Sequence, residues 1–198
     1  MLKKGEERKR RIVKIAHGMF MRKGYDSTSV DEIIAMAGIA KGTFYYYFDS
    51  KDELLEAVVG EILRECEMRA SAILNSEVSI PEKIVGIVMA FRMSGNEFRI
   101  CEAINKEGNI VMHNRLNVEL IDTVVPLLTK VVEEGKREGI FDCNLVPERM
   151  RAILILSSKL FDDMRHSEKD VLVFIDIVEK TLGAKSGTMK FIANLIGE

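Results

Sequence analysis

The chain has 198 residues, of which 47% are hydrophobic and 30% are charged, and its net charge at pH 7 is −2. This composition excludes a disordered or collagen-like chain and predicts a globular protein with a sizeable apolar core. The longest apolar run, residues 84–91, is too short for a membrane span of about 18 residues, and the N-terminus has no secretory signal. Three scattered cysteines without a C-x-x-C pair predict neither a disulfide framework nor a zinc site. We therefore expect a cytoplasmic protein that contains no metal and no cofactor.

Basic residues are concentrated near the N-terminus. Residues 1–50 contain ten Lys or Arg and six Asp or Glu, whereas acidic residues predominate in the remainder. A basic head on an acidic body is typical of a nucleic-acid binder that has a separate second function. An ordinary solvated surface would show the same charge run, so the interpretation depends on the elements that carry it.

The first 50 residues predict three helices. Residues 6–23 carry apolar positions three and four apart, and Gly24 ends this helix as a C-cap. The sequence Ser-Val-Asp-Glu, which begins at Ser29, is a capping box that opens a second helix, and Gly38 ends it in the left-handed conformation. A third helix over 41–48 follows a tight turn. The second and third helices therefore form a helix-turn-helix.

The third helix has one face for the core and one for a partner. Phe44 and Phe48 are four residues apart, so they share a face that packs inward. The other positions point outward, where tyrosines beside a lysine suit phosphates and base edges. Hydroxyl groups at the start of the second helix add a phosphate site. The candidate DNA contacts are Thr28, Ser29, Lys41, Gly42, Thr43, Tyr45, Tyr46 and Tyr47.

A long fourth helix links the head to the rest of the chain. A second capping box begins at Ser50, and the apolar stripe that follows runs to about Asn75 without a breaker at either end. We expect a DNA-binding head over residues 1–50 and a body over 51–198, joined by this continuous helix over 50–75.

The body predicts further helices and no strand, which makes the fold all-α with about nine to ten helices. Pro126 is expected to kink the longest of them. The predicted ranges are 79–93, 96–106, 110–137, 147–164, 167–182 and 188–196.

The helices over 147–164 and 167–182 are apolar on almost all sides, which is more than one core-facing stripe requires. A second buried face is the simplest explanation, and we expect a two-fold dimer through a four-helix bundle. The alternative is that these helices are fully buried inside one subunit. The candidate interface residues are Ala152, Leu156, Leu160, Val171, Phe174 and Val178.

The stretch 12–59 resembles the DNA-binding domain of the TetR family of transcriptional regulators. The resemblance rests on Gly24-Tyr25, Ala37-Gly38-Ile39, the aromatic run over 41–48 and the spacing between them. It implies that Lys51 joins the DNA contacts and that the helical body dimerises and binds a small inducer. One departure is Ala40, which stands where the family often has a serine that caps the recognition helix.

These features predict a ligand-responsive regulator without catalytic residues, most simply a repressor that binds a pseudo-palindromic operator as a dimer and is released by a small-molecule effector. The alternatives are a helical enzyme and a non-DNA-binding dimeric small-molecule-binding protein. Dispersed histidines and the lack of an H-E-x-x-H or G-x-S-x-G motif argue against an enzyme. The effector site is unknown, and its candidate residues are Met89, Met112, His113 and Asn117.

Overall fold

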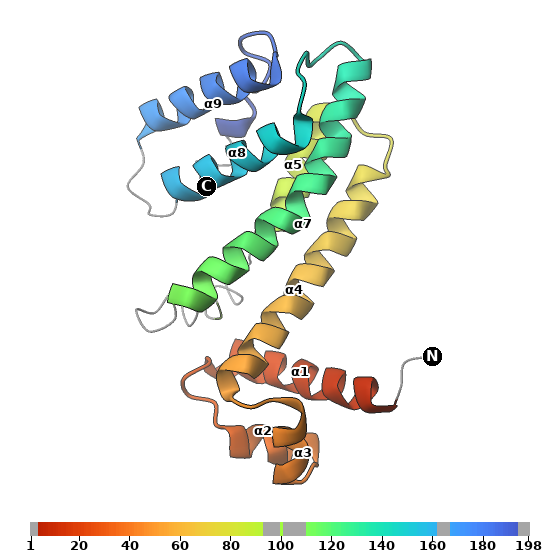
Figure 1. Cartoon of the computed structure of the whole chain (residues 1–198), viewed down its shortest axis with the longest axis vertical. Helices are drawn as coiled ribbons and strands as arrows, with labels where there is room; N and C mark the ends of the chain where they lie inside the picture. The colour runs from red at the N-terminus through yellow and green to blue at the C-terminus, as the bar shows by residue number, and fades with distance from the viewer. Residues whose placement is uncertain (1–3, 93–99, 101–109, 162–166, 194–198) are drawn as a thin grey trace. The chain divides into compact units, whose positions relative to one another are not determined.

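The computed structural model describes residues 4–92, 100, 110–161 and 167–193. Within these residues the chain forms eight helices and no strand, so the predicted all-α class is confirmed (Figure 1). The helices are α1 (Lys4–Lys23), α2 (Val30–Ala37), α3 (Lys41–Tyr47), α4 (Lys51–Leu74), α5 (Ile80–Ala90), α7 (Ile110–Arg137), α8 (Val146–Leu160) and α9 (Glu168–Leu182).

The described helices are fewer than predicted, for two reasons. The helix expected over 96–106 lies outside the described residues, apart from Ile100. In the expected last helix, 188–196, residues 188–191 form turns, with i to i−3 bonds such as that from the Ile192 N–H to the Met189 carbonyl, and residues 194–196 lie outside the described residues. Within the described part of the chain, no helix is both long and apolar enough to cross a membrane.

The contacts divide the chain into two compact units. Among the described residues, the first unit runs to Glu65 and includes 110–116, and the second contains Cys66–Arg92 and the residues from Asn117 onward. This division falls within α4 and not at the predicted boundary between residues 50 and 51. The reason is that the first turns of α4, which carry the fully buried Leu54 and Leu55, belong to the first unit.

Local cap chemistry fixes the ends of α2, as predicted. The Ser29 hydroxyl accepts a hydrogen bond from the Glu32 N–H, and the Glu32 carboxylate accepts one from the Ser29 N–H at 2.9 Å. Gly38 then ends the helix at a φ of 61°, in the left-handed region that favours glycine. α3 begins at Lys41, and the side chain of its N-cap residue, Ala40, offers no cap, so the start of α3 depends on packing.

Large side chains from α1, α2 and α3 meet in the core of the first unit. Phe20 of α1, Ile33 of α2 and Phe44 of α3 are completely buried, and Phe48 is 1% exposed. The predicted inward face of α3 is therefore confirmed. This packing holds the opposite face of α3 at the surface.

The second unit is a separate core of α5, α7, α8, α9 and the end of α4. Lys83 of α5 is 5% exposed and pairs with Glu134 of α7, with 2.7 Å between Nζ and Oε1. Gly183 caps α9 at a φ of 65°, and any Cβ there would collide with the Asp142 carbonyl group. These contacts tie α5 to α7 and the end of α9 to the loop before α8.

Candidate functional site

The outward face of α3 presents aromatic and basic side chains together. Tyr45 is 47% exposed and Tyr46 is 80% exposed, although an aromatic side chain in a short helix would ordinarily pack into the core. Lys41 and Gly42 are exposed at the first turn, and beyond the adjoining residues and backbone of α3 itself nothing lies within 4 Å of where a Gly42 Cβ would be. The sequence predicted this exposure for all four residues.

Tyr47 and Thr43 lie at the edge of this face and are half-buried. The Tyr47 ring packs edge-on against the Tyr46 ring, with 4.9 Å between the ring centroids. Its hydroxyl oxygen lies 3.6 Å from where a Cβ on Gly5 of α1 would be. Tyr47 therefore connects the outward face of α3 to the N-terminal turns of α1.

Two residues beside α2 behave differently from each other. Ser29 is exposed, although its hydroxyl is part of the capping box. Thr28, in contrast, is 0% exposed, and its hydroxyl donates to the Gly24 carbonyl at 2.8 Å. The predicted DNA contact is not available to Thr28, because neither its side chain nor its N–H, which bonds Tyr25, reaches the surface. Its position instead stabilises the turn before α2.

Lys51 packs on an aromatic ring at the start of α4. Its Nζ lies 4.0 Å from the centroid of the Tyr25 ring, a distance suited to a cation–π contact. The Tyr25 hydroxyl donates to Asp52. The pKa of Tyr25 is raised above its ordinary value, mainly because the ring is partly buried and also because the Asp52 carboxylate accepts its proton in this hydrogen bond. Together these contacts join the loop before α2 to α4 and leave Lys51 half-buried.

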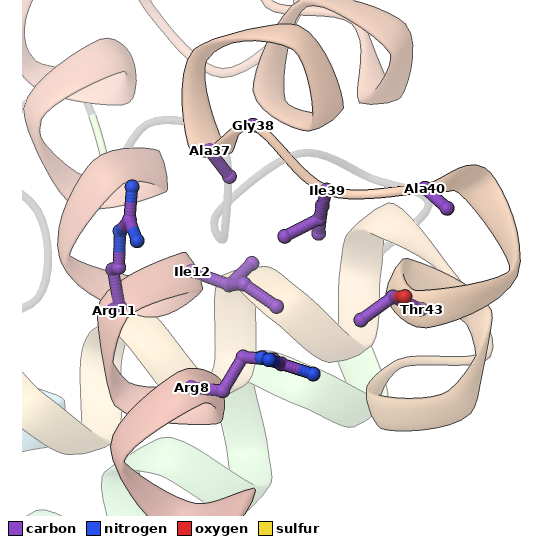
Figure 2. A pocket seen from close by; sticks show the side chains of 8 residues that line it. All are labelled: Arg8, Arg11, Ile12, Ala37, Gly38, Ile39, Ala40 and Thr43. Atoms are coloured by element: carbon purple, nitrogen blue, oxygen red, sulfur yellow. The ribbon is translucent and has the colours of Figure 1, made fainter.

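A hollow of about 250 Å³ lies between α1 and the helix-turn-helix (Figure 2). Its wall combines Arg8 and Arg11 of α1 with the turn over 37–40 and with Thr43 of α3. Arg8 extends from α1 toward Thr43, as Figure 2 shows. The hollow therefore carries positive charge directly beside the outward face of α3.

The basic residues of α1 are divided between two faces of the helix. Lys4, Arg8 and Arg11 have the i, i+4, i+7 spacing of one helix face, a signal that was present in the sequence. Arg10 lies on another face and pairs with Glu61 of α4 at 2.9 Å. The basic residues of α1 are therefore not equivalent.

The second unit contains an apolar cavity of about 470 Å³ between α5, α7, α8 and α9, and this cavity is open to solvent. Of the described side chains that line it, all are apolar except Arg92 and Ser157. Met89, predicted as an effector contact, lies in the wall.

The other candidate effector residues lie elsewhere. His113 and Asn117 are half-buried on α7 and are not part of the cavity wall. The side chain of Met112 lies outside the described residues.

The candidate interface residues on α8 and α9 differ in exposure. Ala152 is exposed, Leu156 and Leu160 are half-buried, and Val171, Phe174 and Val178 are buried inside the second unit. The large apolar side chains of α8 and α9 that are exposed, and could therefore contact a partner, are different residues from the predicted ones. These are Ile155, Leu172, Val173 and Ile177, with exposed fractions of 47%, 63%, 58% and 36%.

Comparison with known proteins agrees with this geometry. Residues 12–58 match the family model for bacterial regulatory proteins of the tetR family. The chain is 23% identical over 185 residues to the HTH-type transcriptional regulator SrpR of Pseudomonas putida, which covers 90% of this chain and 84% of that protein. It is 34% identical over 83 residues to the HTH-type transcriptional repressor KstR2 of Mycolicibacterium smegmatis, over 42% of this chain and 40% of that protein.

Solved structures share the fold along almost the whole chain. RolR without ligand has a TM-score of 0.67 at 19% identity, and the match covers 93% of this chain and 96% of RolR. RolR in complex with the ligand resorcinol has a TM-score of 0.64 at 18% identity, covering 96% of this chain and 94% of RolR. The likeness therefore extends beyond the helix-turn-helix to the helical body.

Proposed function

Because the chain belongs to the TetR family of bacterial transcriptional regulators, we propose that it is a repressor that binds a pseudo-palindromic operator as a homodimer and is released by a small-molecule effector. Its place of action is then the bacterial cytoplasm, where the operator DNA is. The observation that carries the proposal is the outward face of α3, where exposed tyrosines stand beside an exposed lysine.

The proposed DNA interface consists of side chains with complementary tasks. Phenol hydroxyls donate to phosphate oxygens, and tyrosine rings cover sugars and thymine methyl groups. Gly42 allows the backbone of α3 to approach the groove closely. The basic side chains of α1 that line the hollow, Arg8 and Arg11, supply sequence-independent attraction to the phosphate backbone. Lys51 and Ser29 lie at the edges of the proposed interface. Thr28 is buried beneath it and stabilises the turn before α2.

A dimer would bring two recognition helices into successive major grooves about 34–36 Å apart. The exposed apolar residues of α8 and α9 support an interface through these helices, because isolated apolar side chains are common on surfaces but four on two adjacent helices are not. Ala152, Leu156 and Leu160 remain candidates for the edge of this interface.

The effector site we propose is the apolar cavity of the second unit. Its volume lies in the range of small-molecule pockets, about 300–1,000 Å³. RolR, a protein of the same fold, has been solved in complex with the ligand resorcinol, which supports the binding of a small molecule by this fold. The curated relatives are transcriptional regulators, and we propose no catalytic role for any residue of the chain.

The test is a selection of duplexes from a random DNA library by the full-length protein. We expect enrichment of an inverted repeat whose half-sites lie about one helical turn apart. A variant carrying both Lys41→Gln and Tyr46→Ala is the control, because both side chains are exposed and their loss should leave the melting temperature unchanged. This variant should show no enrichment. Selection without any sequence preference by the wild-type protein would overturn the proposal.

A further inference from the structure

Among the described residues that line the cavity of the second unit, one carries a charge: Arg92, which follows α5. Arg92 is exposed as well as lining the cavity, so this residue lies where the cavity meets solvent. Within the described residues, its guanidinium forms no hydrogen bond and no ion pair. The other polar contributor to the wall is the half-buried Ser157 of α8.

The remainder of the wall determines which ligands can fill the cavity. Side chains such as Ile153, Phe174 and Met189 offer no hydrogen bond, and a charged group placed among them would lose its hydration without compensation. No acidic side chain is present among the described lining residues, so a cationic ligand would find no counter-charge. The flexible thioether side chains of Met89, Met150 and Met189 adapt readily to the shape of an apolar body.

From this arrangement we infer that the effector is an amphipathic anion, with an apolar body in the cavity and one carboxylate at the Arg92 guanidinium. The carboxylate would accept charge-assisted hydrogen bonds from Arg92, and Ser157 offers one further hydroxyl donor. The inference rests on the proposed effector site and specifies the chemical class that the site takes.

The experiment measures the binding of three ten-carbon probes to the full-length protein by titration calorimetry. The probes are decanoate, 1-decanol and decylamine, each below its micelle concentration, so that only the head group differs. Decanoate should bind the wild-type protein most tightly and decylamine least. Equal or tighter binding of decylamine or decanol would overturn the inference.

Two pairs of variants locate the binding. Arg92→Gln should weaken decanoate about fivefold, as expected for a solvent-exposed ion pair, and leave decanol unchanged. Arg137→Gln is the control, since Arg137 is also an exposed arginine of the second unit but does not line the cavity. Val88→Phe should weaken the binding of both probes by narrowing the cavity. Val85→Phe, at another half-buried valine of α5 outside the wall, should not.

The same samples are titrated with the selected DNA in the absence of probe. Preference for decylamine by a protein that still binds DNA would overturn the ligand class and leave the regulator intact. Binding of decanoate through Arg92 by a protein that does not recognise DNA would overturn the proposed function instead. Decanoate binding that is unaffected by both Arg92→Gln and Val88→Phe would place the ligand elsewhere and overturn the inference.

Discussion

Lys41 of α3 forms an ion pair with Asp31 of α2, with 3.5 Å between Nζ and Oδ1. Both side chains are largely exposed, 67% for Lys41 and 80% for Asp31, so the pair is worth little to stability. Its position matters more than its strength. An acidic group lies beside the basic residue at the first turn of the recognition helix, and any phosphate that binds Lys41 must compete with it.

Replacement of Asp31 by Asn should therefore strengthen DNA binding. We expect affinity at low salt to rise about two- to fivefold, because a repulsive charge is removed and Lys41 is released. The measurement is fluorescence anisotropy with labelled duplex DNA. Asp176→Asn is the matched control, since Asp176 forms a comparable exposed pair with Lys180 of α9.

The melting temperature of the variant must also be measured, because Asp31 lies in the first turn of α2. There its negative charge interacts with the helix dipole and stabilises the helix by about 0.3–1 kcal/mol. A fall in DNA affinity of Asp31→Asn at an unchanged melting temperature would mean that Lys41 does not face phosphate.

The neighbours Phe44 and Tyr45 separate the two faces of α3. Phe44 is completely buried, so Phe44→Ala should cost about 3–5 kcal/mol by opening a cavity in a small core. Tyr45 is 47% exposed, and its ring packs edge-on against the Phe44 ring with 5.3 Å between the ring centroids. Tyr45→Ala should therefore lower the free energy of unfolding by about 1 kcal/mol or less. Operator affinity should nonetheless fall by about 1–3 kcal/mol if the ring reads a base.

Thermal melting and anisotropy on operator and scrambled DNA check both variants. Destabilisation by Tyr45→Ala that equals that of Phe44→Ala would show that the outward face has been assigned incorrectly.

Elements with local chemical signals could be predicted from the sequence. The capping box at Ser29 and the glycine at Gly38 fixed α2 to within a residue, because the bonds involved join neighbours in the chain. The i, i+4 spacing of Phe44 and Phe48 identified the core face of α3 for the same reason.

Features that depend on tertiary contacts could not be predicted in the same way. In α9, both Phe174 and Leu172 belong to plausible apolar stripes, and only packing against the other helices decides that Phe174 is buried and Leu172 is 63% exposed. Thr28 has the polarity of a surface contact, but the packing of the first unit buries it completely, and its hydroxyl donates to the Gly24 carbonyl. The outcome at each position depends on neighbours that a periodic pattern does not identify.

Charged substitutions on α9 should distinguish the two stripes. Leu172→Glu or Ile177→Glu should give monomers in which the second unit stays folded, because these side chains are exposed in the single chain. Phe174→Glu should unfold the second unit, since Phe174 is 4% exposed and packs edge-on against Phe161.

Light scattering and thermal melting read out these variants. Val118→Glu, at an exposed valine of α7, is the control and should remain dimeric. Persistent dimers of both Leu172→Glu and Ile177→Glu would place the interface on another surface.

The capping box predicts a pH dependence for the head. The pKa of Glu32 is lowered from about 4.5 to about 2, first by its hydrogen bond with Lys23 and then by the Ser29 N–H and hydroxyl. Because the folded-state pKa is depressed, the stabilisation is present above about pH 4.5 and is lost as the pH falls toward 2.

The carboxyl chemical shift of Glu32, followed by NMR from pH 7 to pH 2, measures this pKa. Ser29→Ala should raise it, whereas the pKa of Glu82, lowered by Ser79 in the equivalent position of α5, should not change. An ordinary pKa for Glu32 in the wild-type protein would contradict the cap.

The dependence of DNA affinity on salt tests the central claim, that the basic residues of α1 and the outward face of α3 bind DNA, most directly. A plot of log affinity against log salt should fall with a slope of about −0.9 for each phosphate neutralised, and Arg8→Gln should reduce its magnitude by about one per subunit. Arg10→Gln removes the same charge from a residue that pairs with Glu61, and should change the slope less. A flat plot for the wild-type protein, or equal slopes for the wild type and Arg8→Gln, would contradict the account.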